Sequence, residues 1–267
     1  MSTIIQSAQL RSLDDRRATS SLHGFMPAVF HMFIRRMLSP WTLVFTLGIP
    51  VFMYLIFGVG QEYSLIEMPR GNVAAMVLVS MSQYAAVMIT SMITAGIAIE
   101  RVQGWTRTMA LTPLGIRNYV ASKIVMSLVM TVVSIAFIYA IGFFTDAKMD
   151  AVVWVQTFIL IVVLSVIPAM LGLLVGVVIR GEEAYGVLGG GTALLAFLSG
   201  MFVPLEQLSE FFQKVAEFTP LWGINRLALT AFFGWEELQW KFLFNVFGWL
   251  VIFAVGTWFF SRRSTGR

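Results

Sequence analysis

Long uncharged apolar stretches alternate with short polar segments along almost the whole chain. Crossing about 30 Å of hydrocarbon takes roughly 20 apolar residues in an α-helix, so each stretch of that order predicts a membrane-spanning helix. The pattern therefore predicts an all-α membrane protein with six transmembrane helices. These are approximately Trp41–Phe57, Val73–Ile99, Ile124–Phe144, Ala151–Ile179, Tyr185–Val203 and Phe242–Phe260.

Composition agrees with this class and predicts one domain. Of the 267 residues, 58% are hydrophobic and 12% are charged, and the mean hydropathy is +0.83. A water-soluble domain could not bury so much apolar surface in one core. Because the spans use most of the chain, we expect residues 1–267 to form a single transmembrane domain. Cysteine is absent, which excludes disulfides and Cys-ligated metal sites.

The basic residues predict the orientation of the spans. Most Lys and Arg residues precede the first span, lie between the second and third spans, or follow the sixth. By the positive-inside rule, both termini are then cytoplasmic, and residues 1–23 form a polar cytoplasmic tail. The formal net charge of +4 is explained by this asymmetry, so we expect no nucleic-acid partner.

Two further segments flank the predicted spans. Residues 24–38 place Met26, Phe30, Phe33 and Met37 at helical spacing, which favours an interfacial helix lying on membrane lipid; the alternative is an extension of the first span. Residues 204–239 combine an amphipathic pattern, a Thr219-Pro220 break and an apolar stretch too short to cross. They predict an outer re-entrant helical hairpin between spans five and six.

The polar segment between spans two and three predicts a cytoplasmic helix over residues 100–113. Trp105 and Met109 share a helical face, and Thr112-Pro113 ends the helix, since proline disfavours helical geometry in the residue before it. Such a helix could dock in a groove of a partner and transmit force to the attached spans. The alternative is an ordinary solvated loop.

Motifs for chemistry within this chain are missing. The glycine-rich stretch from Gly186 to Ala193 lacks the Gly-Lys-Ser/Thr of a phosphate-binding loop, and no catalytic or metal-binding pattern occurs. We therefore predict that the chain is not an enzyme and holds no metal or cofactor. Gln83, Tyr84 and Ser199 are polar or aromatic groups within predicted spans, and they are candidates for a substrate path; the alternative is that they only pack helices.

Two motifs in matching positions resemble those of the ABC type-2 exporter permeases. The spacing of Glu100, Gly104, Thr112 and Pro113 is similar to the signature of the loop that forms the coupling helix in this family. The segment Leu198–Gly234 is similar to the family's Gly-x-x-x-Pro segment followed by two helices before the last span. This sequence departs from many members at Thr106 or Arg107, where they carry an acidic residue, and at Met109, where they carry leucine.

The resemblance implies the transmembrane subunit of an ATP-driven exporter in a bacterial cytoplasmic membrane. Its partners would be two ABC ATPase subunits, which bind ATP and Mg²⁺, and a second permease copy or a homologue. The cargo would be an amphipathic or hydrophobic drug or antibiotic; the alternatives are a lipid-linked glycan or lipid carried by the same fold, and a membrane scaffold or sensor without transport. The candidates for coupling to the ATPase are Glu100, Arg101, Gly104, Trp105, Arg107, Thr112 and Pro113.

Overall fold

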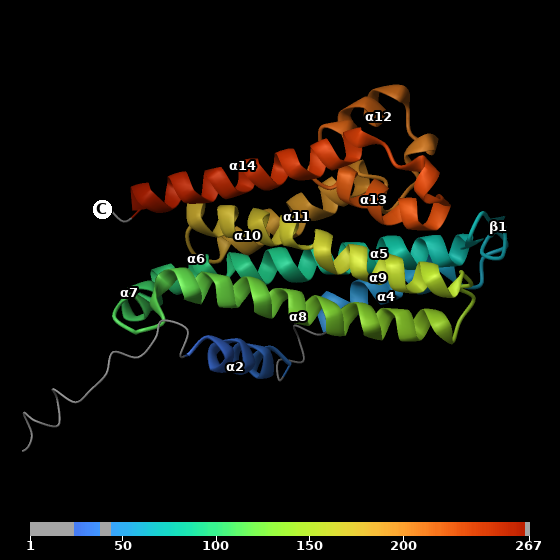
Figure 1. The fold of residues 1–267 in the computed structure, drawn as a ribbon. Helices are drawn as coiled ribbons and strands as arrows, with labels where there is room; N and C mark the ends of the chain where they lie inside the picture. Colours follow the sequence, from blue (N-terminus) through green and yellow to red (C-terminus); the bar gives the residue numbers. More distant parts are fainter. Residues whose placement is uncertain (1–23, 38–43, 265–267) are drawn as a thin grey trace, which may run out of the picture.

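The computed structural model describes residues 24–37 and 44–264, which form an elongated and almost entirely helical bundle (Figure 1). Among these residues, four helical segments are long and apolar enough to cross a membrane. They coincide with the second, third, fourth and sixth predicted spans, as expected for an all-α, multi-pass membrane protein. The segments are Val73–Val102, Gly115–Phe143, Ala151–Val178 and Trp240–Arg262.

Two predicted spans are not among these four segments. The fifth is helix α11 (Glu183–Leu198), which ends before the predicted Val203 because Gly200 adopts a left-handed φ of +82°. Of the first, the structure describes a π-helical turn, η1 (Val44–Gly48), and helix α4 (Ile49–Gly58), while Trp41 lies outside the described residues. The count of six spans therefore stays a prediction.

Helix α5 (Val73–Ala95) is the central helix of the bundle. In the most apolar part of the membrane-spanning segment that contains α5, 78% of the residues are buried. The corresponding share for the segment of α14 (Trp240–Ser264) is 11%. Its many Ala, Ser and Thr residues allow close helix approach. The Thr94 hydroxyl donates across the interface to the carbonyl of Ala169, at 2.8 Å. The helices packed around α5 include α8 (Gly115–Phe143), α9 (Ala151–Leu164), α10 (Val166–Val178), α11 and α4.

Helix α2 (Phe25–Met37) lies along α8 toward the end of the bundle where α14 ends (Figure 1). Its predicted apolar face is divided: Met26 and Phe30 are exposed, whereas Phe33 and Met37 pack beside buried Val29 against α5 and α8. The helix is thus attached to the bundle by one side, and its placement on lipid stays a prediction. The predicted tail, residues 1–23, lies outside the described residues.

The opposite end of the bundle carries a β-hairpin and the two helices of the predicted outer segment (Figure 1). Within the predicted amphipathic part, Leu208 is extended, and helix α12 begins only after Ser209. The amide of Asn245 in α14 donates to the carbonyls of Glu217 and Thr219, which satisfies the backbone at the predicted break. The elements are β1 (Glu67–Met68), β2 (Gly71–Asn72), η2 (Leu205–Gln207), α12 (Glu210–Glu217), α13 (Trp222–Phe233) and η3 (Trp235–Glu237).

Candidate functional site

The chain turns between α6 (Ile97–Val102) and α7 (Trp105–Ala110), and Gly104 forms the turn. Its φ of +79° is in the left-handed region, which a residue without Cβ adopts at little cost. A Cβ at this position would meet nothing within 4 Å, so the requirement for glycine is conformational and not steric. This corrects the expectation of one helix over residues 100–113: Glu100 and Arg101 belong to α6, and a separate helix follows Gly104.

Glu100 is held inside the bundle by an ion pair with α8. Its Oε1 lies 2.6 Å from Nζ of Lys123, and the two side chains are only 23% and 6% exposed. The Lys123 ammonium also lies over the Tyr119 ring, 5.7 Å from the centroid. Glu100 therefore fixes α6 to α8, and its carboxylate is turned toward the helices instead of toward a partner surface.

Arg101 fixes α6 to the end of α10. Its guanidinium donates to the carbonyls of Gly176 and Val177, which belong to the last turn of α10. Carbonyls at a helix C-terminus have no partner within the helix and carry a partial negative charge, so they favour a cation. Two adjacent residues at the end of span two therefore connect it to its neighbours: Glu100 binds span three, and Arg101 binds span four.

Helices α2 and α11 approach the same cluster. A Cβ built on Gly96 would lie 3.1 Å from the Tyr185 hydroxyl of α11 and 3.4 Å from Nζ of Lys123, so both groups reach one point beside α6. Arg36 of α2 is near as well: burial lowers the pKa of its guanidinium, and the neighbouring Tyr185 hydroxyl opposes that shift. The cluster Arg36, Glu100, Tyr119, Lys123 and Tyr185 therefore connects α2, α6, α8 and α11.

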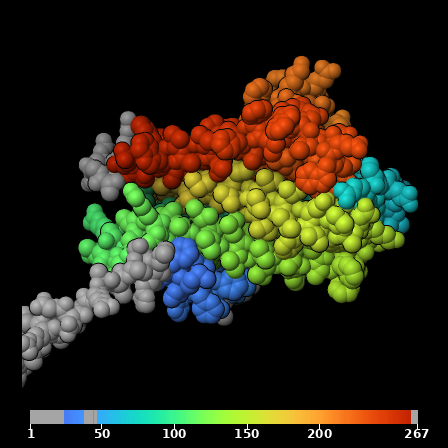
Figure 2. Space-filling model, viewed as in Figure 1, coloured from blue at the N-terminus to red at the C-terminus, as the bar shows by residue number. Residues whose placement is uncertain are grey.

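Helix α7 lies outside this cluster, at the surface of the bundle's end (Figure 2). None of its residues is buried, and the Trp105 side chain is 47% exposed while Arg107 is exposed too. Thr112 ends the segment by donating its hydroxyl to the Met109 carbonyl at 2.8 Å, and Pro113 follows it. An exposed aromatic and a cation on a short helix are a combination suited to docking on another protein.

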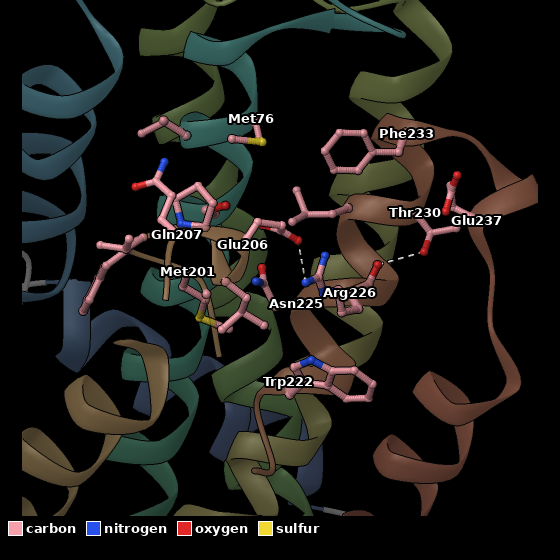
Figure 3. Close-up of a pocket in the computed structure, with 18 of the residues that line it drawn as sticks. Met76, Met201, Glu206, Gln207, Trp222, Asn225, Arg226, Thr230, Phe233 and Glu237 are labelled. Carbon is pink, nitrogen blue, oxygen red and sulfur yellow. Dashed lines mark hydrogen bonds and ion pairs between the residues drawn. The ribbon is translucent and has the colours of Figure 1, made fainter. Parts of the chain in front are cut away.

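A cavity of about 1040 Å³ (Figure 3) is lined by elements that lie at the other end of the bundle, opposite α7 (Figure 1). Its walls come from the start of α5, from the segment after α11 and from α13, and they are mainly apolar. Polar groups at the cavity include the ion pair between Arg226 Nη2 and Glu206 Oε1, at 2.8 Å. Its apolar walls include Met68, Met76, Met81, Met201, Phe202, Trp222, Phe233 and Phe242.

The three predicted substrate-path residues lie behind this cavity and not on its wall. Gln83 is 1% exposed and neither end of its amide has a hydrogen-bond partner among the described residues. The Tyr84 ring meets the ring of cavity residue Phe202 edge to face, with centroids 4.8 Å apart. The Ser199 hydroxyl donates to the Leu195 carbonyl. Of their direct neighbours in sequence, only Gly200 lines the cavity, and a role of the three residues in a substrate path stays a prediction.

Comparison with known proteins decides the family. A family model described as "ABC-2 family transporter protein" matches residues 61–262, which is well over half of the chain. The chain belongs to the ABC-2 family. It is also 27% identical over 194 residues to a Bacillus subtilis protein named "Putative transport permease YvfS", covering 70% of this chain and 76% of that one. The ABC-2 chain described here is thus a transmembrane subunit of an ABC transporter.

Sequence reasoning missed three groups in this ABC-2 chain. Lys123 is not among the candidate residues named from the sequence. Its partner Glu100 lies 23 positions earlier, in α6, and no periodicity reveals this pairing. Arg226 and Asn225 were read as part of a short apolar helix, yet both line the cavity. A signal was present, since two consecutive polar residues interrupt an otherwise apolar stretch.

Among residues 24–37 and 44–264, no group of acidic residues and histidines could hold a metal ion.

Proposed function

We propose that this chain is the permease subunit of an ABC exporter in a bacterial cytoplasmic membrane. It moves an amphipathic or hydrophobic small molecule, such as a drug or antibiotic, outward across the membrane. ATP and Mg²⁺ act on a separate ATPase subunit, and this chain performs no catalysis. Two ATPase copies assemble with two permeases, which are two copies of this chain or one copy and a homologue.

The observation that carries the proposal is the attachment of α7. The exposed helix follows directly after Glu100 and Arg101, which bind α8 and α10 respectively. Packed helices joined by buried polar contacts move as units, because a dense interior deforms little. A displacement of α7 by an ATPase would therefore reach spans two, three and four together. Glu100 and Arg101 act as positioning residues, while Trp105 and Arg107 are the residues for contact.

The position and lining of the cavity support the kind of cargo. It lies at the end of the bundle opposite α7, and its walls combine methionine and aromatic side chains with a few polar groups. Ligand sites for small molecules have this composition, and unbranched methionine adapts to ligands of different shape. The outward direction rests on the family resemblance and on the charge asymmetry of the loops.

The test is ATP-driven movement of an amphipathic dye in proteoliposomes that contain this permease and the ATPase that co-purifies with it from the host membrane. We expect dye movement only with Mg-ATP, and we expect Trp105→Ala to abolish most of it while the complex still inserts. The matched control is Trp235→Ala, because Trp235 lies at the opposite end of the bundle and its exposed fraction, 46%, equals that of Trp105 within a percent.

The two alternatives predict different outcomes. An exporter of a lipid-linked glycan or lipid would retain the ATP and Trp105 requirements, but only such a lipid, and not the dye, would move. A scaffold or sensor would show no ATP-dependent movement of either compound, and Trp105→Ala would have no effect on transport.

A further inference from the structure

Asn225 presents an unused hydrogen-bond acceptor at the cavity near the outer end of the bundle. The residue lines the cavity, and its side chain is 2% exposed. Its Nδ2 donates to the carbonyl oxygen of Ser199 at 2.9 Å, whereas its Oδ1 has no partner among the described residues. Figure 3 shows the amide beside the Glu206–Arg226 pair. A buried acceptor without a partner loses its hydration without compensation.

The orientation of this amide is fixed by its neighbour. A backbone carbonyl only accepts hydrogen bonds, so the amide nitrogen must face Ser199 and the oxygen must face the other way. The free group is therefore an acceptor, and residues 24–37 and 44–264 supply no donor to it. The neighbouring Arg226 does not supply one in this arrangement: its Nη2 donates to the carboxylate of Glu206, and no hydrogen bond to Asn225 Oδ1 forms.

The rest of the lining specifies what kind of molecule carries that donor. Four methionines and several aromatic rings make the wall, which suits a large apolar body of variable shape. The basic side chains on the lining, Arg226 and Lys241, are paired with Glu206 and Glu217 at 2.8 and 3.1 Å. An anionic ligand would have to displace a carboxylate, whereas a hydroxyl or amine would not.

We propose that this cavity binds an amphipathic molecule whose apolar body contacts the methionine and aromatic wall and whose hydroxyl or amine N–H donates to Asn225 Oδ1. The inference rests on the proposed transport function for its biological meaning, since the cavity would be the outer part of the substrate path. Ser199 takes part indirectly, because its carbonyl aims the Asn225 amide.

The test uses the absence of cysteine from this sequence. A single cysteine introduced as Met76→Cys places one thiol on the cavity wall, and the rate of its reaction with a water-soluble maleimide is measured in nanodiscs without nucleotide. The control cysteine, Glu62→Cys, is on the exposed loop before β1 and does not line the cavity. Two dyes of similar size are compared: an ethylamino-substituted rhodamine ester, which carries N–H donors, and tetramethylrhodamine methyl ester, which carries none.

We expect the donor dye to protect Met76→Cys at a concentration about three- to tenfold below that needed by the dye without N–H, as one hydrogen bond would give. Neither dye should protect Glu62→Cys. Adding Asn225→Leu should remove the preference between the dyes while apolar protection persists. Gln156→Met, which removes another amide with a buried unpartnered oxygen away from the cavity, should retain the preference.

Three outcomes would overturn the inference: equal protection by both dyes, no protection by either, or a Met76→Cys thiol that does not react even without dye. Because the binding assay needs no ATP, its result is independent of the transport assay. Donor-dependent binding without ATP-driven movement would leave the site in place and refute the proposed function. ATP-driven transport without any preference for binding the donor dye would support the proposed function and refute the Asn225 site.

Discussion

The ammonium of Lys123 lies 2.6 Å from the carboxylate of Glu100, and this pair joins α8 to α6 one turn before the chain bends into α7. Both side chains are largely buried, and the second carboxylate oxygen, Oε2, has no partner among the described residues. Adjacent Arg101 binds the end of α10. The geometry explains how a six-residue surface helix can be attached to the bundle firmly enough to transmit a displacement.

Glu100→Gln should destabilise the protein strongly, because it leaves the buried Lys123 charge without its partner. Breaking a buried ion pair costs about 3–5 kcal/mol, so the midpoint of thermal unfolding in nanodiscs should fall clearly. Lys123→Met should have a similar effect, and the double variant should recover much of the loss. Glu206→Gln is the comparison, since the Glu206–Arg226 pair is more exposed and should contribute about 0–1 kcal/mol. Strictly additive effects of the two single substitutions would refute the coupling.

Gly104→Val should uncouple ATP hydrolysis from transport while the protein still reaches the membrane. The left-handed φ of +79° at this position costs an L-residue about 1–2 kcal/mol, so a β-branched side chain would redirect α7. Gly104→Asn should retain most activity, because asparagine tolerates this conformation. Since nothing lies within 4 Å of a Cβ here, equal losses in both variants would show that the conformation is not the cause.

Gly172→Ala should weaken the packing of α10 on α5. The added Cβ would overlap the Ser91 carbonyl and the Thr94 hydroxyl, and overpacking of this kind costs about 1–3 kcal/mol. Gly190→Ala in α11 is the matched control, because a Cβ there meets nothing within 4 Å. Thermal unfolding of the two variants should separate them, and equal midpoints would contradict the close approach of α10 to α5.

The Glu206–Arg226 pair should make a small, pH-dependent contribution to stability. Burial raises the pKa of the Glu206 carboxyl, but the hydrogen bond from Arg226, a backbone hydrogen bond and the positive charge of Arg226 together outweigh it, so the net pKa is below the ordinary value. The contribution is therefore present above the unfolded-state pKa and is lost as the pH falls through the lower folded-state pKa. The difference in unfolding midpoint between the parent protein and Glu206→Gln should shrink in acid. A difference that grows in acid would contradict this sign.

Hydropathy was sufficient to predict the segments that contain α5, α8, α10 and α14, because the hydrocarbon thickness imposes length and composition on any spanning helix. The break at Thr219-Pro220 was also predictable, since proline constrains its predecessor, and α12 and α13 flank it.

Contacts between distant segments were not predictable in the same way. Nothing in the local pattern pairs Glu100 with Lys123 or places the Asn245 amide against the backbone at the end of α12. Gly104 was recognised as part of a motif, but its left-handed conformation, which divides the predicted helix, depends on where α7 must point. Asn225 was overlooked because the mostly apolar stretch of 13 residues from Leu221 to Phe233 gave no sign of a cavity beside it.

The most direct test of the central claim is photo-crosslinking from α7 in membranes that hold the complete transporter. A photoreactive amino acid replacing Trp105 should yield a crosslink to the ATPase subunit, and its yield should change when ATP is bound. The same group at Trp235 should yield none, because η3 follows α13, which lies at the end of the bundle opposite α7 (Figure 1). If the Trp105 position captured only lipid, or if Trp235 captured the ATPase equally well, the account of α7 as the coupling element would be contradicted.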